Sequence, residues 1–192
     1  MSLTAKTLRQ RLQGINLYLI GMMGAGKSTT GRSLAQALEY QFFDTDTIAE
    51  QVAGQAIASI FHQQGEAAFR QLETAVLAQL SAYQRLVVAT GGGIVTQAAN
   101  WSYLHHGVVV WLDVPLPLLQ QRLLGDHQRP LLQKDDWPVT LASLLDQRQP
   151  LYAQADVCIT VQPEEAVEAI VNRILTVVDE RIRPDPNSIE LN

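Results

Sequence analysis

The sequence predicts an α/β protein with three layers, in which a parallel β-sheet lies between two layers of helices. Short apolar runs rich in β-branched residues alternate along the chain with longer segments whose apolar residues recur at helical spacing. The runs suit strands that are covered on both faces, and their alternation with helices favours a parallel sheet. A chain of 192 residues, 47% of them hydrophobic, suits one domain with its own core.

Five runs are predicted to form the strands, and six segments are predicted to form helices. Proline stands near the start of several helical segments, which is favourable because the first N–H groups of a helix have no partner within it. The predicted strands are 15–20, 41–43, 86–89, 108–112 and 157–160. The predicted helices are 28–38, 67–80, 98–105, 115–124, 138–149 and 163–178.

The two ends of the chain are predicted to lie outside this single domain, which we place at 15–183. The extension 1–14 has basic residues and no acidic one, which leaves open a targeting leader, but its leucines favour a short amphipathic helix packed on the domain. The stretch Pro-Asp-Pro-Asn-Ser favours a flexible tail at 184–192. The leucines are Leu3, Leu8 and Leu12.

The charge balance and the cysteine content argue against several classes of protein. The formal net charge of −5 argues against a nucleic-acid binder that relies on a basic surface. The single cysteine, Cys158, forms neither a disulfide framework nor a CxxC zinc site and indicates a reducing compartment, so we expect a cytoplasmic protein. No apolar run approaches the roughly 18 residues that span a bilayer, so no membrane partner is expected.

The segment from Gly21 to Ser28 follows the first predicted strand and matches GxxxxGK[ST], the pattern of a phosphate-binding loop. Its glycines let the backbone wrap closely round a phosphate, and N–H groups at the start of the next helix point at it. Lys27 would reach the β- and γ-phosphates, and Ser28 would bind Mg²⁺. The alternative is a glycine-rich turn with an exposed lysine. The residues expected to bind ATP here are Gly24, Ala25, Gly26, Lys27, Ser28 and Thr29.

Two carboxylates, Asp44 and Asp46, follow the second predicted strand. In an extended chain both would point to the same side. One could then hold hydrated Mg²⁺ while the other orients or deprotonates a substrate hydroxyl. Alternatively, Asp46 only caps the next helix, beside a capping-box-like Thr47 and Glu50.

Two further patterns have both a functional and an ordinary interpretation. Arg70 stands three residues before Glu73 on a predicted helix, and such a pair is often a solvated ion pair of little energetic weight. The run Gly91-Gly92-Gly93 ends the third strand, where α/β proteins place ligand loops. Three glycines allow a small ligand to approach the backbone, or they form a flexible turn.

Residues 124–134 form a polar loop with a glycine near its start, between two helical patterns, and contain Arg129. This composition suits a mobile lid that brings a positive charge onto a phosphate when it closes. Arg148 follows near the end of the next helix. The rigid fork of arginine suits two-point recognition of a carboxylate or phosphate.

Together these motifs resemble the shikimate kinases in their order and approximate spacing, over about 15–174. The resemblance implies a P-loop kinase fold like that of the nucleoside monophosphate kinases, with a five-stranded parallel sheet and a lid. It implies transfer of the γ-phosphate of ATP to the 3-hydroxyl of shikimate, a step toward chorismate and aromatic amino acids. The motifs are Gly21 to Ser28, Asp44-Thr-Asp46, Phe69-Arg70-x-x-Glu73, Gly91-Gly92-Gly93, Arg129-Pro-Leu-Leu132 and Arg148-x-Pro-Leu-Tyr152.

The resemblance also implies roles at the acceptor side of the site. Arg70 and Arg148 would clamp the shikimate carboxylate, with the glycine loop beside them. Asp46 would hold the acceptor hydroxyl without needing to be a strong base, because phosphoryl transfer depends mainly on positioning and electrostatics. The glycines of the loop that would contact the substrate are Gly91, Gly92 and Gly93.

On the nucleotide side, the resemblance implies that Lys27 and Arg129 stabilise charge on the transferring phosphate. Ser28 directly, and Asp44 through water, would hold one Mg²⁺. Arg122 matches a position that stacks on adenine, although it could also be a helix-surface arginine. Pro163 begins the segment that matches the adenine loop, although proline there could also simply start a helix.

The expected partners are therefore ATP, as co-substrate, and shikimate, bound by a monomer. Two other functions stay open on the sequence. A P-loop kinase for another small hydroxylated acid, such as gluconate, should lack the combined Asp-Thr-Asp, Phe-Arg and Gly-Gly-Gly set. A catalytically silent nucleotide-binding module should show a damaged phosphate or acceptor site, and the motifs show no such damage.

Overall fold

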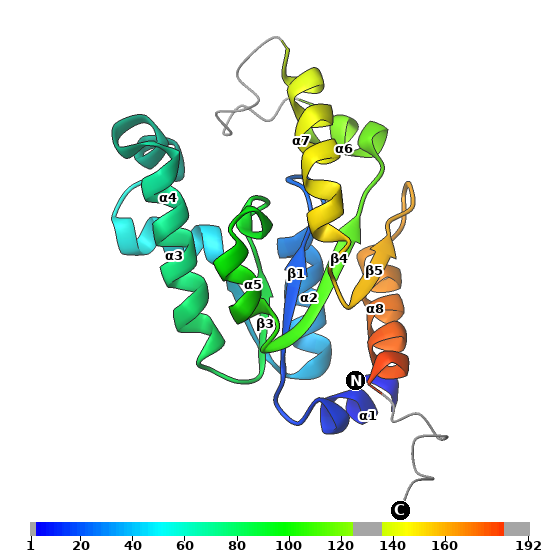
Figure 1. The fold of residues 1–192 in the computed structure, drawn as a ribbon. Helices are drawn as coiled ribbons and strands as arrows, with labels where there is room; N and C mark the ends of the chain where they lie inside the picture. Colours follow the sequence, from blue (N-terminus) through cyan, green and yellow to red (C-terminus); the bar gives the residue numbers. More distant parts are fainter. Residues whose placement is uncertain (1–2, 125–135, 183–192) are drawn as a thin grey trace, which may run out of the picture.

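The computed structural model describes residues 3–124 and 136–182, and a five-stranded sheet lies at its centre (Figure 1). The strand order is β2-β3-β1-β4-β5, and every neighbouring pair is parallel. The predicted fold class is therefore confirmed. The strands are β1 (Asn16–Ile20), β2 (Gln41–Asp44), β3 (Leu86–Ala89), β4 (Gly107–Asp113) and β5 (Val157–Thr160).

Helices connect the strands and cover both faces of the sheet. The chain passes from β1 toward one edge and from β3 toward the other, so right-handed crossovers place α2 and α5 on opposite faces. Within the described ranges, no helix is long and apolar enough to cross a lipid bilayer. The helices are α1 (Leu3–Leu12), α2 (Lys27–Leu38), α3 (Thr45–Ala53), α4 (Ile57–Ser81), α5 (Ala98–Leu104), α6 (Leu116–Leu123), α7 (Trp137–Tyr152) and α8 (Val167–Arg181), with a short 3₁₀ helix, η1 (Ile94–Thr96).

Burial differs between the central and the edge strands. Every residue of β1 and β3 is buried, whereas β5 alternates between buried and exposed residues and no residue of β2 is fully buried. The prediction that all five strands are covered on both faces is therefore wrong for the two edge strands. The runs at 41–43 and 157–160 contain only two and three consecutive apolar residues, and so short a run is compatible with either a central or an edge strand.

Three helical segments differ from the prediction. Helix α3 and the first part of α4 were not among the predicted helices, and α8 begins at Val167 rather than at 163. Gly65 lies inside α4 with a non-helical φ of 81° and ψ of 172°, so the helical spacing before it does not continue after it. Pro163 lies in a turn between β5 and α8 and does not start the helix.

Helix α1 packs against α8 and α2 through an apolar side. Leu8 and Leu12 are fully buried in the core. Arg11 adds an ion pair of 2.6 Å with Asp179 of α8, whose side chain is almost completely buried. These contacts tie the N-terminal helix to the domain, beside the edge of the sheet at which the strands begin.

Candidate active site

The strand order predicts where a ligand should bind. The chain leaves β1 toward one edge of the sheet and β3 toward the other, although these strands are neighbours. In open α/β sheets such a switch point opens a crevice at the carboxyl ends of the strands. The phosphate-binding loop follows β1 and the glycine loop Gly91-Gly92-Gly93 follows β3, so both predicted loops lie at this crevice.

The phosphate-binding loop has the backbone that its glycines permit. Gly21, Gly24 and Gly26 have φ values of 138°, 77° and 89°, which residues with a Cβ adopt only at a cost. At Gly21 a side chain would also meet the Leu112 carbonyl oxygen at 2.6 Å. Lys27 begins α2 and folds back over the loop, donating to the carbonyl oxygens of Gly21 at 2.8 Å and Met22 at 2.9 Å. The ammonium group is thus held at the mouth of the phosphate cradle.

Helix α6 packs on the outer side of this loop. Arg122 Nη1 donates to the carbonyl oxygens of Gly24 at 3.3 Å and Ala25 at 3.4 Å. Leu123 fills the space beside Gly24, where an added Cβ would lie 3.1 Å from Leu123 Cγ. Arg122 is exposed but bound to the loop, so its position is compatible with contact to a nucleotide and is not that of an unattached surface arginine.

Ser28 and Asp44, which are 16 residues apart in sequence, meet at the carboxyl edge of the sheet. Ser28 Oγ donates to Asp44 Oδ2 at 2.5 Å. Asp44 Oδ1 caps α3 by accepting from the N–H groups of Asp46 at 3.0 Å and Thr47 at 3.5 Å. The helix cap is therefore Asp44 and not Asp46. The expectation that both carboxylates project from extended chain is wrong, because Asp46 already lies in the first turn of α3.

The glycine loop approaches acidic and basic side chains so closely that a Cβ would clash with them. At Gly91 an added Cβ would overlap Glu73 Oε1 and lie 2.6 Å from Asp46 Oδ1. At Gly93 it would overlap the guanidinium group of Arg70. The loop therefore lies against side chains from both α3 and α4. Its glycines are needed because these side chains lie so close to the loop backbone, and not only because the chain turns there.

Arg70 is fixed by two carboxylates on its own helix. Its Nη1 donates to Glu73 Oε2 at 2.8 Å, and its Nε and Nη2 donate to Glu66 Oε1 at 3.2 and 3.0 Å. The guanidinium carbon also lies 5.4 Å from the centre of the Phe69 ring. The side chains of Arg70 and Glu73 are only 11% and 1% exposed, so this is not the solvated surface pair that the spacing alone describes.

The sequence indicated no role for Glu73 beyond an ion pair with Arg70. Its Oε1 is buried and has no hydrogen-bond partner among the described residues. Burial raises the pKa of Glu73, the Arg70 guanidinium opposes that rise, and the neighbouring Asp46 carboxylate adds to it. A buried carboxylate oxygen without a partner is costly, and Asp46 Oδ1 also lies beside Gly91. Such an oxygen is suited to accept a hydrogen bond from a bound hydroxyl group.

The opposite side of the glycine loop is held by α7. Arg148 Nη1 donates to the Gly92 carbonyl oxygen at 3.2 Å, and the Tyr152 hydroxyl donates to the same oxygen at 2.5 Å. Arg148 is 8% exposed and Tyr152 is fully buried, with its ring stacked on Trp111. Burial raises the pKa of Tyr152 to about 12, so it stays a hydrogen-bond donor at neutral pH.

The remaining predicted residues fall into two groups. Arg129 and the lid at 124–134 lie outside the described residues, apart from Leu124. Pro163 lies in an exposed turn after β5, which Glu165 shapes by accepting from the Gln162 N–H at 2.9 Å and from Arg173 at 2.8 Å. This turn follows a parallel strand and therefore lies at the same edge of the sheet as the phosphate-binding loop.

Comparisons with known proteins agree with this geometry. The sequence model of the shikimate kinase family matches residues 23–179. A protein named shikimate kinase from Trichormus variabilis is 58% identical over 167 residues, which are 87% of this chain and 92% of the relative. The same name belongs to a relative from Thermosynechococcus vestitus, 54% identical over 92% of this chain and 97% of its own length.

Solved structures give the same assignment. The shikimate kinase from Acinetobacter baumannii in complex with shikimate superposes with a TM-score of 0.85 at 40% identity, covering 90% of this chain and 97% of the other. A gluconokinase from Sinorhizobium meliloti has a TM-score of 0.53 at 16% identity, which shows a shared fold alone. The family match, the sequence identities and the site geometry agree. The chain therefore belongs to the shikimate kinase family and is a phosphotransferase that phosphorylates shikimate.

Proposed function

We propose that this member of the shikimate kinase family transfers the γ-phosphate of ATP to the 3-hydroxyl of shikimate, with the residue roles that follow. The observation that supports these roles best is the convergence of three helices on the glycine loop. Two arginines and two carboxylates from α3, α4 and α7 surround three glycines at the carboxyl edge of the sheet. A small polyhydroxy acid needs such a mixture of cations, hydrogen-bond acceptors and unobstructed backbone.

Arg70 and Arg148 would bind the substrate carboxylate. Both are almost buried, and both are already oriented by hydrogen bonds, Arg70 by two glutamates and Arg148 by the Gly92 carbonyl. Preorganised guanidinium groups lose little rotamer freedom when they bind, and their forks match the two oxygens of a carboxylate. The absence of a Cβ atom at Gly93 leaves room for the Arg70 guanidinium group directly beside the glycine loop.

Asp46 would orient the acceptor hydroxyl toward the phosphate. It lies in the first turn of α3, beside Gly91 and near the Ser28–Asp44 pair. The transition state of phosphoryl transfer is loose, so alignment of the attacking oxygen contributes more than a strong base does. Asp46→Asn should therefore depress kcat far more than it weakens ATP binding.

Lys27, with Arg129 from the predicted lid, would stabilise the charge on the transferring phosphate. The cradle fits this role, because three positive-φ glycines expose backbone N–H groups at the start of α2. Ser28 Oγ and Asp44 Oδ2 supply adjacent oxygen ligands of the kind that Mg²⁺ takes, Ser28 directly and Asp44 through water. When bound, one Mg²⁺ would neutralise part of the negative charge of the phosphates.

A substrate panel tests the assignment. ADP release should depend on shikimate, and ³¹P NMR of the product should show a phosphate ester at the 3-position. Shikimate that lacks the 3-hydroxyl should bind without turnover, and gluconate should give no signal above background ATP hydrolysis. A phosphate on another hydroxyl, or equal turnover of gluconate, would contradict the proposed geometry.

A further inference from the structure

A second pocket lies at the opposite edge of the sheet, between α1 and the beginnings of three strands. It has a volume of about 280 Å³ and is lined by six residues. Three of its residues stand just before strands: Gly14 before β1, Tyr40 before β2 and Arg85 before β3. The pocket therefore lies at the edge of the sheet where the strands begin. A five-residue strand is about 16 Å long, which separates this pocket from the active site. The lining residues are Arg9, Gln10, Gln13, Gly14, Tyr40 and Arg85.

The three turns at this pocket are held together by backbone hydrogen bonds. The Arg85 N–H donates to the Gly14 carbonyl oxygen at 2.8 Å, and the Gln41 N–H donates to the Arg85 carbonyl oxygen at 2.9 Å. Gln13 and Arg85 have φ values of 49° and 61°, a region that usually favours glycine. Gln13 and Arg85 therefore occupy backbone conformations that glycine would adopt with less strain. Both of their side chains line the pocket.

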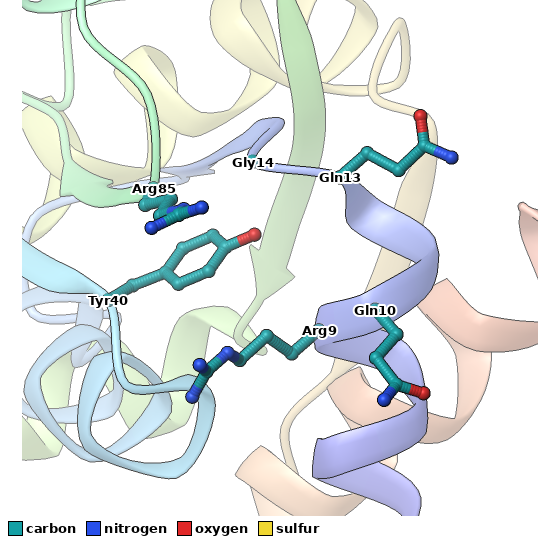
Figure 2. A pocket seen from close by; sticks show the side chains of 6 residues that line it. All are labelled: Arg9, Gln10, Gln13, Gly14, Tyr40 and Arg85. Atoms are coloured by element: carbon teal, nitrogen blue, oxygen red, sulfur yellow. The ribbon is translucent and has the colours of Figure 1, made fainter.

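The Tyr40 hydroxyl has no acceptor for its proton among the described residues. Tyr40 is 8% exposed, and its hydroxyl is buried beside the Gly14 backbone. Figure 2 shows the ring between the Arg85 and Arg9 side chains, with the hydroxyl directed toward α1. A buried hydroxyl whose proton has no acceptor is destabilising, and a ligand that accepts its hydrogen bond would remove that cost.

The pocket is also electropositive. Arg9 and Arg85 line it, and no lining residue is acidic. Arg9 forms an ion pair with Glu39, but this pair is largely exposed, and no acidic partner of Arg85 is recorded within 3–124 and 136–182. Burial raises the pKa of Tyr40, whereas the Gly14 backbone and the charges of Arg85 and Arg9 oppose that rise, so both guanidinium groups act on the hydroxyl.

We propose that this pocket binds a small organic or inorganic anion, whose carboxylate or phosphate group accepts a hydrogen bond from the Tyr40 hydroxyl and is balanced by the positive charges of Arg85 and Arg9. Two cationic forks and one neutral donor match the oxygens of such a group. The volume lies just below the range of about 300–1,000 Å³ for sites of organic ligands, so the ligand is a small metabolite or ion. The site does not overlap the ATP and shikimate sites. Arg9, Gln10, Gln13 and Gly14 also precede residue 23, where the family match begins.

Calorimetry on the full chain tests the proposal while the active site is filled with shikimate, Mg²⁺ and a non-hydrolysable ATP analogue. The probes are inorganic phosphate, succinate, and butane-1,4-diol as an uncharged control of similar length to succinate. Saturable binding of either anion at one site, without binding of the diol, is expected. Binding of phosphate alone or succinate alone identifies which anionic group the pocket prefers. The absence of saturable binding for both anions would overturn the proposal.

Three variants test whether the anion binds at this pocket. Arg85→Gln should weaken anion binding about tenfold or more, since it removes a charge-assisted contact. Tyr40→Phe should weaken it by about threefold to tenfold while the melting temperature without anion stays the same or rises, because the unpaired hydroxyl is gone. Arg181→Gln is the matched control, an exposed arginine that does not line the pocket, and should change affinity by less than about twofold.

All three variants should keep the wild-type kcat, since these residues lie outside the active site. Tyr40→Phe preserves the packing of the ring, so it keeps the test valid if Arg85→Gln destabilises the turn. Equal anion affinity in Tyr40→Phe, Arg85→Gln and the wild type would show that the anion binds elsewhere and would overturn the proposal.

Discussion

The two halves of the active site are constructed in different ways. The phosphate half is one continuous segment, Gly21 to Ser28, fixed by β1 before it and α2 after it. The acceptor half draws on α3, α4, the loop after β3, and α7. The geometry of the phosphate half is therefore local, whereas that of the acceptor half depends on contacts between side chains far apart in sequence.

The halves also differ in how they hold charge. In the phosphate half, Lys27 rests on backbone carbonyl oxygens that are always present. In the acceptor half, Arg70, Glu73 and Arg148 are all nearly buried and are stabilised by one another and by the glycine loop. Removing one member of a buried charged group leaves its partner unpaired, which is costly. Conservative changes should therefore have larger consequences in the acceptor half.

The largest expected effect is in the phosphate half. Lys27→Ala removes the cation proposed to act on the transferring phosphate, so kcat should fall by about 10³-fold or more. The fold should persist, since the side chain packs on loop carbonyls and not in the apolar core. ADP release and the far-UV melting curve measure the two effects. Turnover within a few-fold of wild type in a folded variant would refute this role.

Gly93→Ala tests the acceptor half through steric contact alone. Gly93 has an ordinary φ of −98°, so alanine adds no backbone strain, but its Cβ would overlap the Arg70 guanidinium group. The arginine is the flexible partner and should move, which would raise the KM for shikimate by about tenfold to hundredfold. The KM for ATP should stay within about twofold of wild type, and both constants come from steady-state kinetics.

A double-mutant cycle with Arg70→Lys makes this test specific. If Gly93→Ala acts by displacing the guanidinium group, its effect on the shikimate KM should shrink markedly once Arg70 is lysine. Full additivity of the two substitutions would show that Gly93 acts on the substrate by another route. Gly54→Ala is a control for a methyl group added in open space. Its left-handed φ of 64° should lower the stability of the variant, but nothing lies within 4 Å of its Cβ position, so the shikimate KM should stay unchanged.

Arg70→Lys by itself compares the two-pronged guanidinium group of arginine with the single ammonium charge of lysine. Lysine keeps the charge but loses two-point binding and the Phe69 contact, so substrate affinity should fall by about 1.5–3 kcal/mol, a tenfold to hundredfold rise in the shikimate KM. A shikimate analogue with a neutral group in place of the carboxylate is the control. Wild type should discriminate against it more strongly than the variant does. Identical discrimination would leave carboxylate binding to Arg148.

The two halves were not equally predictable from the sequence. Gly21 to Ser28 could be assigned because each residue acts through its own backbone or an adjacent one, and the flanking strand and helix were recognised. The Ser28–Asp44 hydrogen bond itself was not predicted. The motifs assigned Ser28 and one of the two aspartates to Mg²⁺, and only the family resemblance singled out Asp44, which is 16 positions away from Ser28 in sequence. The order of the strands, which brings the loops after β1 and β3 together, has no local signal in the sequence.

The acceptor half shows why the rest could not be predicted. Spacing placed Arg70 and Glu73 on one helix face but gave no burial, and the burial of Glu73 depends on the glycine loop that arrives from β3. The cap of α3 is Asp44 because the strand ends there, two residues earlier than the cap position of a helix capped by Asp46. Tyr152 was part of a recognised motif, but its contact with Gly92 becomes visible only once α7 is placed.

The smallest expected effect concerns the pH dependence of stability in the acceptor half. Burial raises the pKa of Glu73 above its ordinary value of 4.5, although Arg70 opposes the rise. A carboxyl group with a raised pKa in the folded state contributes stability below its unfolded pKa, and that contribution is lost as the pH rises through the folded pKa. Glu73→Gln removes this titration while keeping a similar shape.

The difference in melting temperature, Glu73→Gln minus wild type, should therefore increase as the pH rises from about 4 through the raised pKa, and then become constant. Taking the difference cancels the carboxylates that titrate alike in both proteins. Glu66→Gln is the matched control on the same helix, because Glu66 also contacts Arg70 but is largely exposed, so the effect of burial is specific to Glu73. A melting-temperature difference for Glu73→Gln that falls as the pH rises would contradict this expectation. It would mean that the ion pair with Arg70 affects the pKa of Glu73 more than burial does, and that the buried charges stabilise the acceptor half.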